Sequence, residues 1–394
     1  MSRLWDKGAP LDQRVLQYTA GEDYALDERL VRYDVRASIA HAHMLQRSGL
    51  LAAADSDAIC KALSEIAEEH ARGAWHIELE DEDGQTALEK RLTARIGAAG
   101  GRIHLGRSRN DQVLTAIRLY LRDATRELGA GAERVAAALD ALAARQGKTS
   151  LPGYTHMQQA MPSSVALWAG GFAAEIRDDA AGIAAANRRI DRNPLGSAAG
   201  YGTPGLALNR AQTSRELGFG STHEPVTAVQ LSRGKAEAQV LFELTLLAQD
   251  LGRFAADVLL FYTQEFGYIE LPDAYTTGSS IMPQKRNPDV FELVRARSAT
   301  ALGCLTEALA ICAKLPSGYQ RDLQLLKFPL FRSIDLAQQS LDVLPPAIEA
   351  LRFRAERIAL DPSIHAAEQA NAIAVKEGIP FREAYRRAAE KLKR

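Results

Sequence analysis

Cysteine is scarce in this 394-residue sequence, which contains three, with no Cys-x-x-Cys spacing. This excludes a disulfide framework and the common paired-cysteine zinc sites. The chain also lacks an excess of positive charge, because 48 Lys and Arg are balanced by 49 Asp and Glu. This balance argues against nucleic acid or an anionic membrane as the main partner, since both require a concentrated basic surface. No apolar run approaches the ~18 residues of a membrane helix, and the start MSRLWDKGAP lacks the apolar core of a signal peptide. We therefore expect a soluble, cytoplasmic, globular protein, with no nucleic acid and no membrane as partner.

Strand-like alternation is scarce as well, whereas strong helix formers such as Ala, Leu, Glu and Arg recur throughout the chain. The segment Gly234–Tyr262 carries apolar side chains at alternating spacings of four and three, which is typical of a helix packed along a long neighbour. Similar seams run from Ile117 to Leu142 and from Val290 to Leu309. These segments predict an all-α fold, with a long central helical bundle and smaller helical domains at either end.

We expect an N-terminal helical domain at 1–103, the bundle domain at 104–345 and a short C-terminal helical domain at 346–394. The predicted helices at 111–146 and 234–262 would each span roughly 40–50 Å. Helices of that length often exceed the core of one protomer, so we expect several subunits to share the bundle. A monomer whose seams are all internal is the alternative.

The loop from Thr277 to Pro288 carries the densest set of polar residues, with hydroxyls, cations and an amide, and it ends at a predicted helix N-terminus. Backbone N–H groups and the helix dipole favour anions at such a position. The loop could hold a carboxylate with Lys285 and Asn287 while presenting Ser279. A solvated loop in which Asn287 is an ordinary N-cap is the alternative.

This loop resembles the signature of the fumarase/aspartase superfamily, in the pattern Gly278-Ser279-Ser280-x-Met282-Pro283-x-Lys285-x-Asn287-Pro288. Further segments are similar to the argininosuccinate lyase branch, which includes the delta-crystallins, and they occur in family order: Tyr33-Asp34-Val35, His104–Gln112, Pro152–Gln158, Asn193–Gly196, Tyr319–Lys327 and Gly378–Ala384. The resemblance implies a carbon–nitrogen lyase that cleaves argininosuccinate to arginine and fumarate by β-elimination, in arginine biosynthesis. It also implies a homotetramer whose active sites are shared between three subunits.

The resemblance also implies roles for individual residues. Ser279 would abstract the proton, Lys285 would stabilise the doubly negative intermediate, and His156, oriented by Glu292, would protonate the leaving nitrogen. The implied substrate-binding residues are Ser108, Arg109, Asn110, Thr155, Asn287, Tyr319, Gln324 and Lys327. This chemistry requires no cofactor and no metal, and the spacing of His41 and His43 places their rings on different helix faces.

Each assignment has a structural alternative. Ser108 and Asn110 could cap the following helix, Arg109 could be a solvated surface charge, and Lys327 could be a surface cation. His156 could be a structural loop residue, and Glu292 could stabilise a helix N-terminus. The combined occurrence of these residues in order favours the active-site interpretation.

Three positions depart from the family pattern. Gln85 stands where many relatives have histidine, Leu105 replaces a typical threonine, and Thr19–Asp23 lacks the usual serine contact. These departures lie near the leaving-group side, so the amine half could differ, as in an N-acylated argininosuccinate or another N-succinyl amine. A non-catalytic crystallin-like protein is a further alternative, although retention of the elimination residues counts against it.

Overall fold

The computed structural model describes residues 12–392, so the expectation about the first ten residues lies outside the described chain. The fold is all-α, as predicted. Its longer helices are α1 (Gln13–Ala20), α3 (Val31–Arg47), α4 (Ala53–Ala71), α5 (Gly84–Ile96), α7 (Arg109–Gln146), α8 (Val165–Ile190), α11 (Lys235–Tyr262), α12 (Asp289–Cys312), α13 (Lys327–Ala350), α14 (Ala366–Glu377) and α15 (Phe381–Leu392).

The remaining elements are short. Among the helices they are α2 (Asp23–Leu26), α6 (Ala98–Gly101), α9 (Arg210–Glu216) and α10 (Thr227–Leu231). The strands form two-stranded pairs only: β1 (Ser150–Thr155) with β2 (Gln158–Ser164), β3 (Arg192–Asn193) with β4 (Ser221–Thr222), and β5 (Ile269–Glu270) with β6 (Arg352–Phe353). Within residues 12–392, no helix is long and apolar enough to cross a membrane.

The chain forms two compact units. Unit 1 comprises the chain up to Glu127, Gly182–Glu243 and Leu302–Asp335, and unit 2 comprises Leu128–Ala181, Leu244–Ala301 and the chain from Leu336. The five long helices α7, α8, α11, α12 and α13 each contribute residues to both units. The three sequential domains expected from the sequence stay a prediction.

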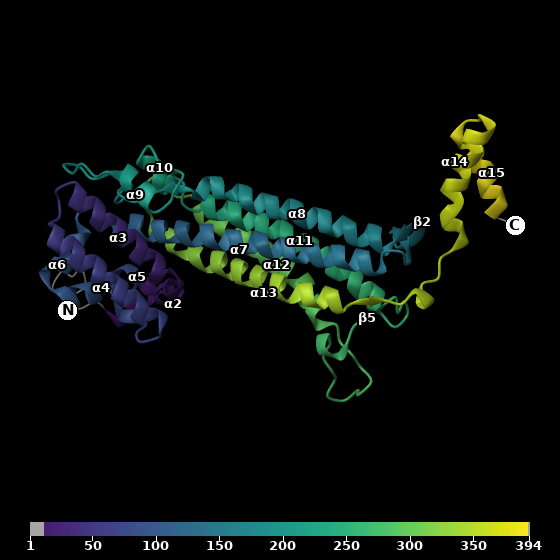
Figure 1. Cartoon of the computed structure of the whole chain (residues 1–394), viewed down its shortest axis with the longest axis horizontal. Helices are drawn as coiled ribbons and strands as arrows, with labels where there is room; N and C mark the ends of the chain where they lie inside the picture. The colour runs from purple at the N-terminus through teal and green to yellow at the C-terminus, as the bar shows by residue number, and fades with distance from the viewer. Residues whose placement is uncertain (1–11, 393–394) are drawn as a thin grey trace. The chain divides into compact units, whose positions relative to one another are not determined.

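Unit 1 has its apolar core among α3, α4 and α5, which lie close together in Figure 1. Leu45, Ile59 and Ala87, one from each helix, are completely buried. The end of α5 is marked by Gly97, whose φ of 65° suits a residue without a Cβ atom. This core supports the helix ends and loops that carry the polar residues of unit 1.

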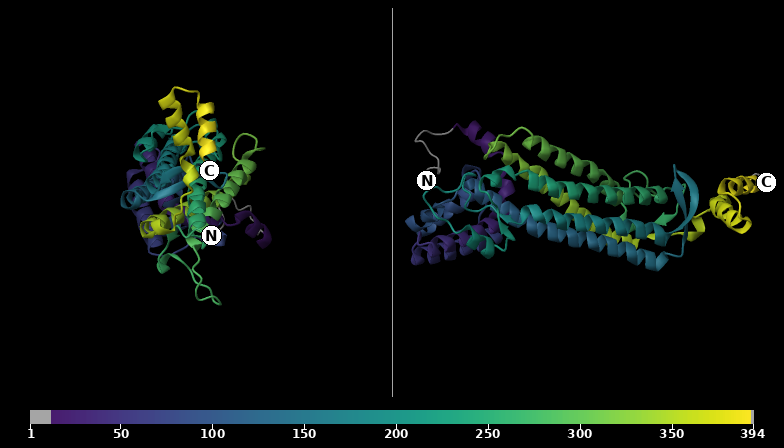
Figure 2. Two further views of the ribbon diagram at one scale, coloured as in Figure 1. Left: turned by 90° about the vertical axis from the view of Figure 1, so that its right-hand side faces the viewer. Right: turned by 90° about the horizontal axis from the view of Figure 1, so that it is seen from above.

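In unit 2, segments of the five long helices run side by side (Figures 1 and 2). The predicted seam residues of α11, from Leu244 to Val258, are buried. The Trp168 ring on α8 packs on Phe254 of α11, which in turn contacts Phe291 of α12. Arg297 of α12 donates to the α13 backbone at Leu336 O, 3.2 Å away, which joins the next pair of helices.

Two local features differ from the sequence interpretation. The family-like segment Pro152–Gln158 lies in the β1–β2 hairpin, which the sequence patterns did not predict. The position expected to separate the bundle domain from the C-terminal domain, 345/346, lies inside a helix, because α13 contains Pro345 and Pro346 and continues to Ala350.

Candidate active site

The start of α7 is fixed by contacts between Ser108 and Asp111. The Ser108 N–H donates to Asp111 Oδ1 at 3.0 Å, and the Asn110 N–H donates to Ser108 Oγ at 3.3 Å. Asp111 Oδ2 also accepts from the N–H groups of Gly196 and Ala198, at 2.8 and 2.9 Å. Burial raises the pKa of Asp111 to about 6, against the opposing effect of these N–H donors. Ser108 therefore has the capping position considered above, and its contact with substrate stays a proposal.

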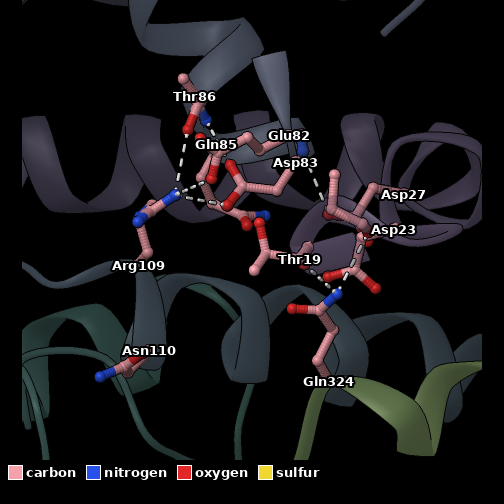
Figure 3. A network of polar contacts seen from close by, with 12 residues as sticks. Thr19, Asp23, Asp27, Glu82, Asp83, Gln85, Thr86, Arg109, Asn110 and Gln324 are labelled. Atoms are coloured by element: carbon pink, nitrogen blue, oxygen red, sulfur yellow. Dashed lines mark hydrogen bonds and ion pairs between the residues drawn. The ribbon is translucent and has the colours of Figure 1, made fainter. Parts of the chain in front are cut away.

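Arg109 extends from the first turn of α7 toward the N-terminus of α5 (Figure 3). Its Nη1 donates to Asp83 Oδ2 at 2.8 Å, and Glu82 Oε2 lies 3.9 Å away. Asp83 also caps α5, because its Oδ1 accepts from the Thr86 N–H at 2.8 Å. Arg109 is thus oriented by carboxylates, so the alternative of a solvated surface charge is wrong.

Lys327 lies at the start of α13 and is only 2% exposed. Its ammonium is 2.6 Å from Asp27 Oδ1 and 3.0 Å from Asp23 Oδ2. Burial alone would lower the pKa of Lys327, but Asp27 and Asp23 outweigh it and raise the pKa, so the ammonium stays charged. Burial raises the pKa of Asp23 to about 6, with Asp27 adding to the rise and Lys327 opposing it. The alternative that Lys327 is a surface cation is therefore wrong.

A pocket of about 80 Å³ in unit 1 gathers predicted residues from two distant segments, 109–110 and 319–327. Five of the expected substrate-binding residues line it: Arg109, Asn110, Tyr319, Gln324 and Lys327. Gln324 is held by the backbone, because its Nε2 donates to the carbonyl oxygens of Thr19 and Ala20 at 3.0 and 3.1 Å. The pocket is therefore lined by cations and amide groups, and carboxylates pair with two of the cations.

The same pocket is lined by residues that sequence reasoning did not assign, namely Asp23, Asp83, Gln85, Val113, Arg233 and Arg321. Arg233 is 4% exposed, and its Nε and Nη1 have no hydrogen-bond partner within the described residues. Its guanidinium carbon lies 5.4 Å from the centre of the Tyr319 ring. Gln85 donates to Asp34, a buried carboxylate. A single arginine next to a glycine gave no signal in the sequence that could have identified Arg233.

The Ser279 loop lies in unit 2 and is closed at its neck by backbone bonds between Thr277 and Asn287, at 2.8 and 3.0 Å. The Asn287 amide donates to Thr277 Oγ1 and to Gly278 O, at 3.3 and 3.2 Å, so its side chain holds the loop neck together. Ser279 Oγ accepts from the N–H groups of Met282 at 3.2 Å and Ile281 at 3.4 Å. Lys285 is exposed, and its side chain forms no ion pair within the described chain.

Thr155 and His156 lie at the tip of the β1–β2 hairpin, also in unit 2. His156 and Met157, the two turn residues, have φ values of 52° and 62°. Two-residue hairpin turns require such angles, but glycine and asparagine usually supply them. Non-glycine residues in this region are strained, and such strain is concentrated at functional sites. Both side chains are exposed.

The structure thus forms two groups of candidate residues, one in each unit. Unit 1 holds Ser108, Arg109, Asn110, Tyr319, Gln324 and Lys327, and unit 2 holds Thr155, His156, Ser279, Lys285, Asn287 and Glu292. Glu292 is exposed on the first turn of α12, and within residues 12–392 no hydrogen bond or ion pair joins it to His156. In the same range, no group of three or more His, Cys, Asp or Glu residues could hold a metal ion.

Comparison with known proteins covers nearly the whole chain. Residues 10–303 match the family described as Lyase. The chain is 47% identical to an argininosuccinate lyase of Sorangium cellulosum, over 99% of this chain and 90% of that protein. The chain belongs to the argininosuccinate lyase family. An argininosuccinate lyase of Thermotoga neapolitana is 39% identical, over 99% of this chain and 98% of that protein.

Solved structures share this all-α fold. EDDS lyase in complex with formate has a TM-score of 0.81 and 25% identity, over 97% of this chain and 76% of that one. A class II fumarase from Schistosoma mansoni, at 18% identity, covers 95% of this chain and 92% of its own, with a TM-score of 0.79. The fumarase comparison concerns the fold alone. As a member of the argininosuccinate lyase family, the chain is a lyase.

Proposed function

We propose that this lyase cleaves argininosuccinate to arginine and fumarate by β-elimination, in the cytoplasm and as part of arginine biosynthesis. The observation that carries the proposal is the unit 1 pocket, which brings five predicted substrate-binding residues from separate segments to one place. The names of the relatives at 47% and 39% identity support the choice of substrate.

The first chemical step removes a proton from the carbon next to a carboxylate, and this builds a second negative charge on that carboxylate. Preorganised cations and N–H donors stabilise such charge. Ser279 is the proposed base, and the N–H groups of Ile281 and Met282 at its Oγ would stabilise the alkoxide form. The unpaired ammonium of Lys285 is the proposed cation for the carboxylate that becomes doubly negative.

The second step breaks the carbon–nitrogen bond. Its electron pair leaves with the nitrogen of the guanidinium group, which takes a proton from His156, while the carbon skeleton becomes fumarate. The imidazole is exposed at the strained hairpin tip, so it is accessible to a ligand held by another copy of the chain, and histidine is the side chain that most often serves as a general acid. Glu292 would orient His156, and Thr155 would contact the succinyl carboxylates.

We propose that the complete site forms in a homotetramer, in which three subunits contribute to each site. Helix α12 supports this assembly, because Leu293, Leu302 and Leu309 are 58%, 50% and 54% exposed. Leu302 and Leu309 belong to the seam predicted from the sequence. Large apolar side chains that stay half exposed along a helix favour packing against another copy.

For a direct test, argininosuccinate is added to the purified protein and the appearance of fumarate is measured by ultraviolet absorbance. We expect steady fumarate release and an equal amount of arginine. Activity on another N-succinyl amine but not on argininosuccinate would change the amine half of the proposal and keep the elimination. Absence of turnover on every succinyl amine would favour the non-catalytic, crystallin-like alternative.

A mixing experiment tests the sharing of sites. Arg109→Ala removes a unit 1 group, and Ser279→Ala removes a unit 2 group, so each variant alone should be inactive. After the two are unfolded and refolded together, random assembly would leave about a quarter of the sites with both groups intact. Refolding each variant alone is the control. No recovery in correctly assembled mixtures would contradict shared sites.

A further inference from the structure

A second pocket in unit 1, of about 450 Å³, lies apart from the residues of the candidate active site. It is formed where the end of α8, the β3 strand, α10 and the start of α11 come together. Its polar lining residues are Arg188, Arg189, Arg192, His223, Ser232 and Lys235. The volume is in the range of roughly 300–1,000 Å³ that small-molecule sites occupy.

The pocket is strongly basic. Arg188, Arg189, Arg192 and Lys235 line it, and no Asp or Glu of the described residues does so. All four of these side chains are exposed, and none forms an ion pair within residues 12–392. Four cations without carboxylate partners around one cavity repel each other, and a bound anion would remove that repulsion.

His223 adds a hydrogen-bond donor instead of a fifth charge. Its Nδ1 lies 3.0 Å from Nη1 of Arg118, a buried arginine that can only donate, so Nδ1 is the acceptor. Burial, together with the Arg118 charge, lowers the pKa of His223 to about 4, so the ring is neutral near pH 7. The proton of the neutral ring is therefore on Nε2, which makes Nε2 a donor.

The helix dipole explains the positions of only some of these cations. Arg188 and Arg189 are in the last turn of α8, where cations are stabilised by the helix dipole. Lys235 is the first residue of α11, at the positive end of its dipole, where a cation is disfavoured. Backbone N–H groups at that helix start would instead favour an anion. Within residues 12–392, the side chains of Lys235 and Arg192 thus have no carboxylate partner that explains their position.

We propose that this pocket binds a small molecule carrying two or more phosphate groups, held by Arg188, Arg189, Arg192 and Lys235. Guanidinium groups match phosphate oxygens in a two-pronged geometry, and Lys235 adds a point charge. A single phosphate would leave most of the volume empty. The side chains of Ala228, Leu231 and Ala236 on the same wall would contact the uncharged part of a nucleotide.

The test is calorimetric titration of the full chain at constant, near-physiological ionic strength, with pyrophosphate, adenosine triphosphate and citrate as separate probes. We expect saturable binding of a phosphate probe, with a single set of sites and weaker binding of citrate. The Arg189→Gln/Lys235→Gln double variant should weaken that binding by about tenfold or more. Arg192→Gln, an independent variant, should weaken it as well.

The matched control is Arg215→Gln, which removes an exposed arginine from α9 of the same unit. It should leave the affinity unchanged. Tighter binding of adenosine triphosphate than of pyrophosphate would show that the apolar wall contributes. The proposal is overturned if the wild type binds neither phosphate probe, if citrate binds equally well, or if the double variant and the control lose affinity alike. Because binding is measured without turnover, the outcome is independent of the proposed lyase reaction.

Discussion

The Lys327 ammonium of unit 1 and the Lys285 ammonium of unit 2 have opposite surroundings. Lys327 is 2% exposed and lies between Asp23 and Asp27, whereas Lys285 is exposed and unpaired within the described chain. The same contrast holds for Arg109, which is held by Asp83, and for His156, which projects from a hairpin tip. Unit 1 therefore fixes its candidate binding groups in advance, whereas unit 2 presents its candidate reacting groups to the outside.

This contrast has a physical consequence. A buried ion pair is rigid, but it costs desolvation and is stable only while its partners remain. The charged groups of an exposed loop need little desolvation and the loop can move, but water screens the interactions of these charges. The electrostatic interactions of the reacting groups with a ligand would become strong only when another surface excludes water around them. Four substitutions test this difference, in order of expected effect.

Ser279→Ala should reduce turnover on the order of 10,000-fold, about 5 kcal/mol of activation free energy, because it removes the proposed base. Stability should stay unchanged, because the side chain bonds only backbone N–H groups of its own loop. Fumarate release and thermal unfolding are the measurements. Ser280→Ala, next to it and exposed, is the control. Equal activity of the two variants would remove Ser279 from its proposed role.

Lys327→Met should lower the free energy of unfolding by roughly 3–5 kcal/mol, because Asp23 and Asp27 would remain buried without their cation. Urea unfolding measures the effect. The matched substitution Lys314→Met changes an exposed lysine and should cost little. A loss of less than about 1 kcal/mol, the value typical of surface ion pairs, would mean that the buried triad does not behave as a unit.

Asp34→Asn should change how stability depends on pH. Burial raises the pKa of Asp34 from 3.8 to about 6. Between these values the folded chain binds more protons than the unfolded chain, so the free energy of unfolding falls as pH rises through this window. Across this window, Asp34 lowers the free energy of unfolding by about 3 kcal/mol at most, and the Asp34→Asn variant should not show this decrease. Unfolding at pH 5 and pH 7 measures the difference, with the exposed Asp57→Asn as control. Equal pH slopes for wild type and Asp34→Asn would contradict it.

Met157→Gly should raise the free energy of unfolding by about 0.5 kcal/mol. Relief of its φ of 62° gains roughly 1–2 kcal/mol, and the added freedom of the unfolded chain takes back up to about 1 kcal/mol. Met157→Ala removes the same exposed side chain but keeps the strained angle, so it should bring no gain. If alanine and glycine stabilise alike, strain at the hairpin tip is not the cause.

Local sequence patterns predicted much of the fold and the chemistry of the loops. The spacing of apolar residues in 234–262 predicted α11 correctly, since helix periodicity is a local property. The motif around Ser279 was recognisable because its residues are contiguous. The hairpin at 150–164 was not predicted, since Pro152 pairs with Pro162 in strands whose composition is untypical. The contacts of the Asn287 amide across the loop neck were not predicted either, since Thr277 and Gly278 lie ten and nine positions away.

By itself the sequence determined which segments are helical, where they break, and which residue types stand at the breaks, because these depend on neighbours along the chain. Only the tertiary structure decided which of those residues meet. Lys327 and Asp27 are 300 positions apart, and no pattern in either segment encodes their contact. The basic pocket at Lys235 likewise arises from helix ends that packing brings together. Charge pairing and burial are properties of the folded core, since both depend on which surfaces exclude water from each other.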